Sequence, residues 1–199
     1  MRVLVACEFS GVVRDAFIRH GHEAVSCDLC DTESPGPHIV GDVREHLAGD
    51  WDLMIGHPPC TFLSNSGVRW LHTDDERWHR MREAAEFFNV VLNAPIPHIC
   101  VENPVPHKYA SQLIGRYCDQ IIQPFHFGHA ESKATCLWLK GLPNLKATSK
   151  LKRPDCGHWD NQTPSGQNKL SPSPDRSKLR ARTYEGIAEA MATQWSVLY

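Results

Sequence analysis

The clearest structural signal in this sequence is the stretch Trp51-Asp52-Leu53-Met54-Ile55-Gly56-His57-Pro58-Pro59-Cys60. Its first part is a short apolar run with the length of a buried strand. The run leads directly into two prolines, which fix the backbone and place the next side chain beyond the strand rather than in the core. We therefore expect a strand at residues 52–56, with Cys60 at the mouth of a sheet.

Similar β-rich runs recur over the first two thirds of the chain and alternate with helical patterns. This alternation is the signature of parallel strands joined by crossover helices. Besides residues 52–56, we expect strands at residues 3–7, 24–28, 38–40, 98–102, 120–125 and 135–139. The sequence thus predicts an α/β fold with a mostly parallel sheet of about seven strands and helices on both faces.

Two helices are marked by apolar stripes. One starts near Thr73, where Thr73-Asp74-Asp75-Glu76 has the spacing of a capping box. Its stripe consists of Trp78, Met81, Ala85, Phe88 and Leu92. A last helix carries Ile187, Met191 and Trp195 at intervals of four residues and closes the chain. Both stripes should pack on the sheet.

The bulk composition indicates one compact unit, because 199 residues can bury a substantial core. No apolar run has the length of a membrane span, and the N-terminus does not have the pattern of a signal peptide, so we expect a cytoplasmic protein. The eight cysteines are then best explained as small hydrophobic residues in a reducing compartment, and Cys7 and Cys100 as strand residues of the core.

The formal net charge of −2 provides no overall positive field that would attract a polyanion. A nucleic-acid partner would have to be held by local basic patches. Two such patches lie in polar, proline-rich sequence: Lys146, Lys150, Lys152 and Arg153, and then Arg176, Lys178, Arg180 and Arg182. Contact with DNA and an ordinary solvated loop explain these patches equally well.

Polar residues follow the predicted strands, where open α/β sheets bind their ligands. The first strand leads into Glu8-Phe9-Ser10-Gly11, in which Gly11 lets the backbone approach a ligand at the start of a helix. Asp28 ends the second strand and could accept hydrogen bonds from ribose hydroxyls. Asp42 follows the third and could reach an adenine amino group. Each alone is more often a structural turn or a solvated strand end, but their order favours a nucleoside-bearing cofactor.

Cys60 follows the strand predicted at residues 52–56 and Glu102 ends the strand predicted at residues 98–102, and the two form a chemically meaningful pair. C5 of a pyrimidine is a poor nucleophile until a thiolate adds at C6 and converts the ring to an enamine. A carboxylic acid at N3 stabilises the charge that develops. An activated cysteine beside a glutamate would therefore explain both residues. His57 adjoins the cysteine and could either tune it or form the pocket wall.

Pro59-Cys60 and Glu102-Asn103 resemble the Pro-Cys and Glu-Asn motifs of the DNA cytosine-C5 methyltransferases, above all their short phage-type members. The similarity covers the core from Val3 to about Leu139, and the last helix with the preceding Arg182-Thr183-Tyr184-Glu185-Gly186. It implies a Rossmann-like, S-adenosylmethionine-dependent methyltransferase fold. It also implies methyl transfer to C5 of a cytosine in DNA, flipped out of the duplex, through a covalent bond between Cys60 and C6.

The resemblance also assigns roles by position. Cys60 would be the nucleophile and Glu102, followed by Asn103, the partner of N3. The S-adenosylmethionine pocket would be formed by Glu8, Phe9, Ser10, Gly11, Asp28, Leu29, Asp42, Val43, Pro58 and Pro59. Within it, Asp28 would hold the ribose and Asp42 the adenine, and the two prolines would border the methionine end.

The chain departs from this family in two places. Its usual Arg-x-Arg element is missing, and the comparable region, residues 127–135, offers Lys133 or His129 as a substitute. The large target-recognition domain is reduced, so we expect a catalytic core at residues 1–141, a minimal recognition insert at 142–178 and a C-terminal helix at 179–199 that packs back on the core. So short an insert leaves three alternatives: a very short recognition site, a partner such as a second copy in a homodimer, or a free nucleotide as substrate.

Other interpretations are open as well. Cys27, Cys30, Cys156 and His158 could be assembled into a zinc site, although Asp28 has a better use at its strand end and we expect no metal. The turn His57-Pro58-Pro59 also resembles the Pro-Pro-aromatic turn of adenine-N6 enzymes, which would make the chain an amino-methyltransferase. The non-enzymatic alternative is a binding module that keeps the cofactor pocket, and the presence of both Cys60 and Glu102 disfavours it.

Overall fold

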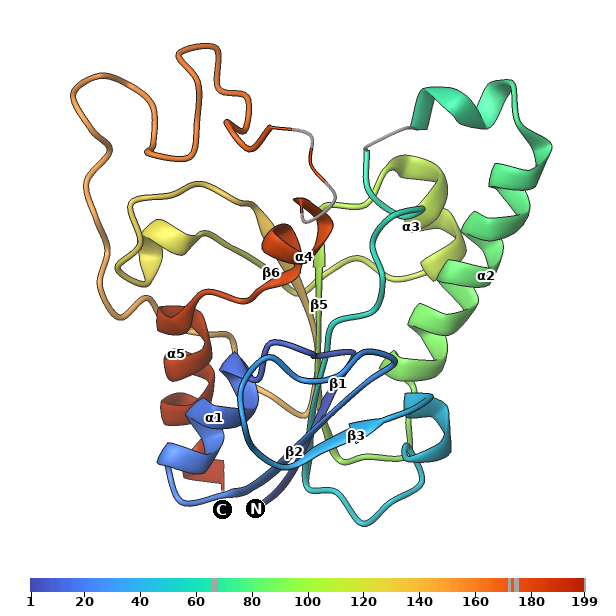
Figure 1. The fold of residues 1–199 in the computed structure, drawn as a ribbon, viewed down its shortest axis with the longest axis vertical. Coiled ribbons are helices and arrows are strands. Elements are labelled where there is room, and N and C mark those ends of the chain that lie inside the picture. The colour runs from blue at the N-terminus through green and yellow to red at the C-terminus, as the bar shows by residue number, and fades with distance from the viewer. Residues whose placement is uncertain (66–67, 172, 174–175, 199) are drawn as a thin grey trace.

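A computed structural model describes residues 1–65, 68–171, 173 and 176–198 of the chain (Figure 1). Its centre is a seven-stranded sheet with the order β3-β2-β1-β4-β5-β7-β6. The strands are β1 (Arg2–Ala6), β2 (Glu23–Asp28), β3 (His38–Val40), β4 (Leu53–Gly56), β5 (His98–Pro104), β6 (Gln120–Ile122) and β7 (Thr135–Lys140). The first five run parallel, and β7 lies antiparallel to β5 and β6. The predicted fold class is confirmed.

Helices cover both faces of the sheet (Figure 1). The helices are α1 (Val12–Arg19), α2 (Asp75–Leu92), α3 (Lys108–Ile114), α4 (Arg176–Ala181) and α5 (Glu185–Trp195), with short 3-10 helices at Val43–Glu45, Val68–His72, Pro124–His126 and Ser196–Leu198. On one face, Phe17 of α1 and Trp195 of α5 pack with Ile55. On the other, Phe88 of α2 packs with Met54 and Val101. None of the described helices is long and apolar enough to cross a membrane.

Both predicted helical stripes face the sheet. Met81, Ala85, Phe88 and Leu92 of α2 are buried, as are Ile187, Met191 and Trp195 of α5. The start of α2 differs by one residue from the prediction, because Asp74 rather than Thr73 is the N-cap and its side chain accepts a hydrogen bond from the Arg77 amide. The Thr73 hydroxyl donates instead to the Trp70 carbonyl.

Two predicted strands are too long at their carboxyl ends. β6 stops at Ile122, since Pro124 has no N–H for the ladder and begins a 3-10 helix. β1 stops at Ala6, and Cys7 turns away with a φ of 58°, a left-handed conformation that is uncommon for residues other than glycine. The prediction that Cys7 belongs to the strand core was therefore wrong, whereas Cys100 is fully buried as expected.

The polar tract after Leu142 contains no helix or strand in its described part before α4. It is nevertheless fastened to the core. The Asn161 side chain exchanges two hydrogen bonds with the Ser132 backbone, at 3.0 and 2.9 Å. The rings of Phe125 and Trp159 stack with their centroids 4.5 Å apart. The tract lies at the top of Figure 1, beyond the end toward which β5 runs.

Candidate active site

The strand order places a topological switch point between β1 and β4. From β1 the chain moves outward to β2 and β3, and then returns to β4 on the other side of β1. Open α/β sheets bind ligands in the crevice that such a reversal leaves at the carboxyl ends of the strands. The segments at this position are Cys7-Glu8-Phe9-Ser10 after β1 and His57-Pro58-Pro59-Cys60 after β4.

The register of β4 and β5 brings His57 and Glu102 together. Ile55 pairs with Cys100 and Gly56 with Val101, so the next residues of the two parallel strands, His57 and Glu102, are neighbours on one face. His57 Nδ1 lies 3.5 Å from Glu102 Oε2, and only 11% and 9% of the two side chains are exposed. The two side chains form a buried pair at the floor of the crevice.

The two members of this pair shift each other's pKa in opposite directions. Burial disfavours the imidazolium, but the hydrogen bond and charge of Glu102 outweigh it and raise the His57 pKa. Burial likewise disfavours the carboxylate, but His57 and then Lys133 hold the Glu102 pKa below its ordinary value. The geometry therefore favours one proton held between the two groups, with the charges paired.

Glu102 has a further partner from the C-terminal part of the chain. The Thr183 hydroxyl, in the loop between α4 and α5, donates to Glu102 Oε2 at 3.4 Å. Lys133 Nζ donates to the Arg180 carbonyl at 2.9 Å. The positive charge of Lys133, the predicted substitute for the Arg-x-Arg element, helps to lower the pKa of Glu102. The alternative, His129, accepts a hydrogen bond from the Gly186 amide at 2.9 Å and serves the start of α5.

Hydrogen bonds to two backbone carbonyls fix the turn that carries Cys60. Asn103 Nδ2 donates to the Pro58 carbonyl at 2.8 Å. The amides of Leu63 and Ser64 both donate to the Cys60 carbonyl at 3.0 Å. The thiol of Cys60 is half-buried, as expected for a residue at the mouth of the sheet. Asn103 therefore contacts the turn directly, and its Oδ1 is buried without a partner.

A cavity of about 110 Å³ joins these groups. Its lining residues are Cys7, Glu8, Phe9, Ser10, His57, Pro58, Pro59, Cys60, Glu102, Asn103, Pro104, Lys133, Arg180, Ala181 and Thr183. This volume is well below the roughly 300 Å³ of whole-ligand pockets and matches part of a ligand, such as one ring. A larger cleft of about 610 Å³ adjoins it, because Pro104, Lys133, Arg180 and Thr183 line both.

The loop after β1 is held by its own acidic residue. Glu8 is buried and accepts the α1 amides of Val13 at 2.7 Å and Arg14 at 3.2 Å, so it caps the helix. Gly11 has a φ of 75°, and a Cβ there would lie 2.5 Å from the buried Arg14 guanidinium. Gly11 is thus required by packing. Phe9 and Ser10 line the cavity.

The residues at the ends of β2 and β3 lie near this loop. The carboxylates of Asp28 and Asp42 both raise the pKa of Cys7, to about 12, after the larger effect of burial, so both approach the end of β1. The Leu29 side chain is 77% exposed, an open apolar surface beside Asp28. Asp42 binds Arg44 through Oδ1 at 3.0 Å, whereas Val43 is buried in the core. The Asp28 carboxylate and the exposed Leu29 fit the adenosine half of a cofactor. Asp42 already accepts four hydrogen bonds from Arg44, so it would have to release some of them to bind a ligand.

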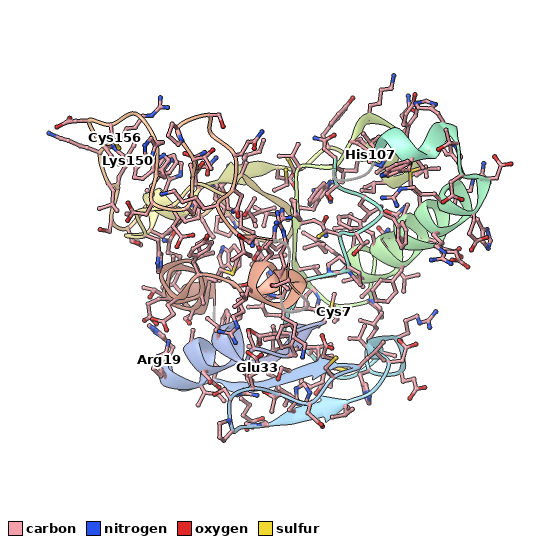
Figure 2. All side chains as sticks on the ribbon, turned by 45° about the horizontal axis from the view of Figure 1, so that its top comes forward. Cys7, Arg19, Glu33, His107, Lys150 and Cys156 are labelled. Atoms are coloured by element: carbon pink, nitrogen blue, oxygen red, sulfur yellow. The ribbon has the colours of Figure 1, made fainter. Side chains whose placement is uncertain are left out.

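The candidate zinc ligands do not gather. Cys27 is buried, and its thiol donates to the Gly41 carbonyl at 3.6 Å. Cys27 pairs in register with Ala6, next to Cys7, and Figure 2 shows Cys7 far from Cys156. Among the residues that the structure describes, no group of three or more His, Cys, Asp or Glu side chains is placed to hold a metal ion.

Sequence reasoning missed five residues of the cavity: Cys7, Pro104, Arg180, Ala181 and Thr183. In the sequence, Arg180 stood out only as a charge and Thr183 only as part of the approach to the last helix, and nothing marked Ala181. Their signal lies in packing, since a Cβ at Gly186 would lie 2.1 Å from the Phe127 carbonyl oxygen. The glycine allows α5 to begin close against the segment before β7, and this brings Thr183 to Glu102.

No family model matches the chain, and no curated protein is similar to it in sequence. Solved structures resemble it. An E. coli prophage protein described as a DNA modification methyltransferase has a TM-score of 0.45 at 15% identity, over 70% of this chain and 46% of that one. A mutant of Spodoptera frugiperda DNMT2 has a TM-score of 0.42 at 13% identity, over 77% and 55%. The chain spans about half the length of these proteins. Because both TM-scores are below 0.5, we infer the function from the chain's own residues.

Proposed function

We propose that this chain is a cytosine-C5 methyltransferase that acts on DNA with Cys60 as its nucleophile. The observation that carries the proposal is the cavity at the switch point, which Cys60, Glu102 and Lys133 line together. A thiol, a carboxyl group and a cation around a space of one ring are the groups that C5 substitution of a pyrimidine requires.

The chemistry follows from these three groups. Cys60 Sγ adds to C6, and the electron pair of the C5–C6 bond moves toward C5 and N3. Glu102 delivers a proton to N3 and so neutralises the adduct, while Lys133 adds positive charge on the same side. C5 is then an enamine carbon that can accept a methyl group. Loss of the C5 proton to water, departure of the thiolate and return of the N3 proton to Glu102 restore the aromatic ring.

The cofactor that suits this reaction is S-adenosylmethionine, which supplies an electrophilic methyl group when bound. Asp28, Leu29 and Asp42 would hold its adenosine half at the ends of β2 and β3, where the two carboxylates approach Cys7. Phe9, Ser10, Pro58 and Pro59 would border its methionine end, since they line the cavity next to Cys60. The Glu8 carboxylate would act indirectly, by fixing the loop through the α1 amides.

DNA is the polymer that fits the surroundings. The cleft beside the cavity is lined by Lys133, Lys169 and Arg180, by one acidic residue, Glu131, and by Arg182, which is paired with Glu33. A second groove, of about 760 Å³, has Lys150, Lys152 and Arg153 on its walls and no acidic residue among its lining. Lysines and arginines bind phosphates, and a base can leave the duplex for a cavity that admits a ring. The insert thus supports DNA over a free nucleotide.

Methyl transfer tests the proposal directly. The purified chain is incubated with methyl-tritiated S-adenosylmethionine and either mixed-sequence duplex DNA or deoxycytidine monophosphate, and the products are separated as nucleosides. We expect label in 5-methyldeoxycytidine from DNA, none with Cys60→Ser, and an unchanged yield with Cys156→Ser, which removes an exposed thiol in the insert. Label only in the nucleotide would refute DNA as substrate. Label in N6-methyladenine, or full activity of Cys60→Ser, would refute the covalent mechanism.

A further inference from the structure

His57 is a costly residue to place where it is. Its ring is buried beside Glu102, and its second nitrogen, Nε2, is buried without a hydrogen-bond partner. A polar nitrogen in this state is destabilising, because it has lost its hydrogen bonds to water and gained none in return. The backbone does not need an imidazole here, since the strand contact of this residue is made by its amide, which donates to the Ala6 carbonyl at 2.9 Å. The side chain therefore has a task inside the cavity.

Charged and titratable groups surround His57 from several elements. Glu102 on β5 and Glu8 in the loop after β1 favour its imidazolium form, and Lys133, in the segment before β7, opposes it. The other titratable or charged side chains of the cavity are Cys7, Cys60 and Arg180. Glu102 contacts His57, with Oε2 3.5 Å from Nδ1. A proton that leaves Nδ1 therefore has the Glu102 carboxylate as an adjacent acceptor.

We propose that His57 stores the proton that Glu102 delivers to N3 of the target base, and takes it back when the base is released. This inference rests on the proposed function and extends it, because it gives Glu102 a proton source. His57 is a positioning residue in this scheme, since it acts through Glu102 and does not touch the reacting atoms.

The proton that reaches N3 comes from the site and returns to it. Before the base arrives, the pair holds one proton on His57 Nδ1, Glu102 is a carboxylate, and Cys60 has given its own proton to water and reacts as a thiolate. As Cys60 Sγ bonds to C6, the Nδ1–H bond breaks, the proton moves through the Glu102 carboxyl group, and an N3–H bond forms. His57 is then neutral, Glu102 is again a carboxylate and the adduct is uncharged. When the thiolate leaves, the N3–H bond breaks and the proton returns to Nδ1.

The unpartnered Nε2 fits the same scheme. An imidazolium has two N–H donors, and Glu102 accepts only one of them. The other, on Nε2, finds no acceptor among the protein atoms around it, which favours release of the Nδ1 proton to Glu102.

The scheme predicts a specific pH dependence. Glu102 raises the His57 pKa, so the pair keeps its proton above the pH at which an ordinary histidine loses it. In His57→Gln, Glu102 has to hold the proton alone, and an ordinary glutamic acid titrates about two units below an ordinary histidine. The variant therefore loses the proton at lower pH than the unchanged protein. The rate of the variant, relative to that of the unchanged protein, must therefore fall as the pH rises.

The test uses C5 hydrogen exchange without cofactor, which reports addition at C6 alone. DNA that carries tritium at C5 of cytosine is incubated with the chain, and release of tritium to water is measured from about pH 6 to about pH 8. We expect the rate of His57→Gln, relative to the unchanged protein, to fall about ten-fold over this range. The control is His98→Gln at the opposite end of β5, where the ratio should be constant.

A second variant separates proton storage from structural support. Glu102→Gln presents an amide N–H to N3 and passes no proton, so adding His57→Gln to it should change the exchange rate by the same factor at every pH. A ratio for His57→Gln that does not vary with pH would overturn the role of His57 and leave the proposed function standing. If neither the unchanged protein nor any variant releases tritium from this DNA, both the role of His57 and the proposed function are overturned. Thermal unfolding of each variant confirms that it is folded.

Discussion

The groove of the insert gives a prediction with a calculable size. Lys150, Lys152 and Arg153 lie along one wall of the groove that also contains Phe125 and Trp159, and none of its lining residues is acidic. Figure 2 shows Lys150 in the lobe formed by the insert. If these three cations each neutralise one phosphate, replacing all three by glutamine removes three counterion-release contacts.

The magnitude follows from the charge density of duplex DNA. Each contact contributes about −0.9 to the slope of log K against log salt concentration, so three contribute about −2.7. Between about 50 and 200 mM salt, the unchanged chain should lose about 40-fold more affinity than the triple variant. Fluorescence anisotropy of labelled duplex DNA over this range measures both slopes.

A matched control is available in the same chain. Arg2, Arg19 and Arg116 are exposed and each is paired with a carboxylate, of Asp50, Glu189 and Asp119 respectively. Their triple replacement by glutamine removes the same charge but should leave the slope unchanged. Equal slopes for the unchanged chain and the groove variant, or an equal change in the control, would refute phosphate binding by the groove.

Three further predictions concern the core of the site. Asn103→Ala removes the hydrogen bond to the Pro58 carbonyl, so it should lower the free energy of unfolding in urea by about 1–3 kcal/mol and slow tritium release. Unchanged values of both would show that Asn103 does not stabilise the turn. Gly56→Ala places a Cβ 2.7 Å from Val91 Cγ1 and should lower the free energy of unfolding by about 1–3 kcal/mol. Adding Val91→Ala should restore part of this loss, and additive losses in the double variant would argue against the contact. Burial raises the pKa of Cys7 to about 12, so at neutral pH it should react with iodoacetamide more slowly than the exposed Cys156, as mapped by peptide mass; equal rates would show that Cys7 is not buried.

The strand ends of the site could be predicted because the signal for each lies within a few consecutive residues. A short apolar run that meets Pro58 and Pro59, or an apolar run that ends in Glu102, shows both the strand and the residue beyond it. The sheet's parallel half follows from the alternation with helices. The direction of β7 could not be predicted, because a buried apolar run has the same appearance in a parallel and in an antiparallel strand.

The contacts between distant segments could not be predicted. The pairing of His57 with Glu102 depends on the register of β4 and β5, and one residue of slip would place the side chains on opposite faces. The approach of Thr183 depends on how α5 packs. Arg14 was not noticed at all, although its fully buried guanidinium binds the Ser34 carbonyl at 2.9 Å and so holds the loop before β3.

The covalent bond is the centre of the account, and it can be observed. Duplex DNA in which every cytosine is 5-fluorocytosine should trap the chain, because after methyl transfer C5 carries fluorine and no proton, so the thiolate cannot be eliminated. We expect a stable adduct in the presence of S-adenosylmethionine, with the added mass on the peptide that contains Cys60 and no adduct with Cys60→Ser. An adduct at another cysteine, or none with a folded and DNA-binding chain, would contradict the central claim that Cys60 attacks the cytosine ring.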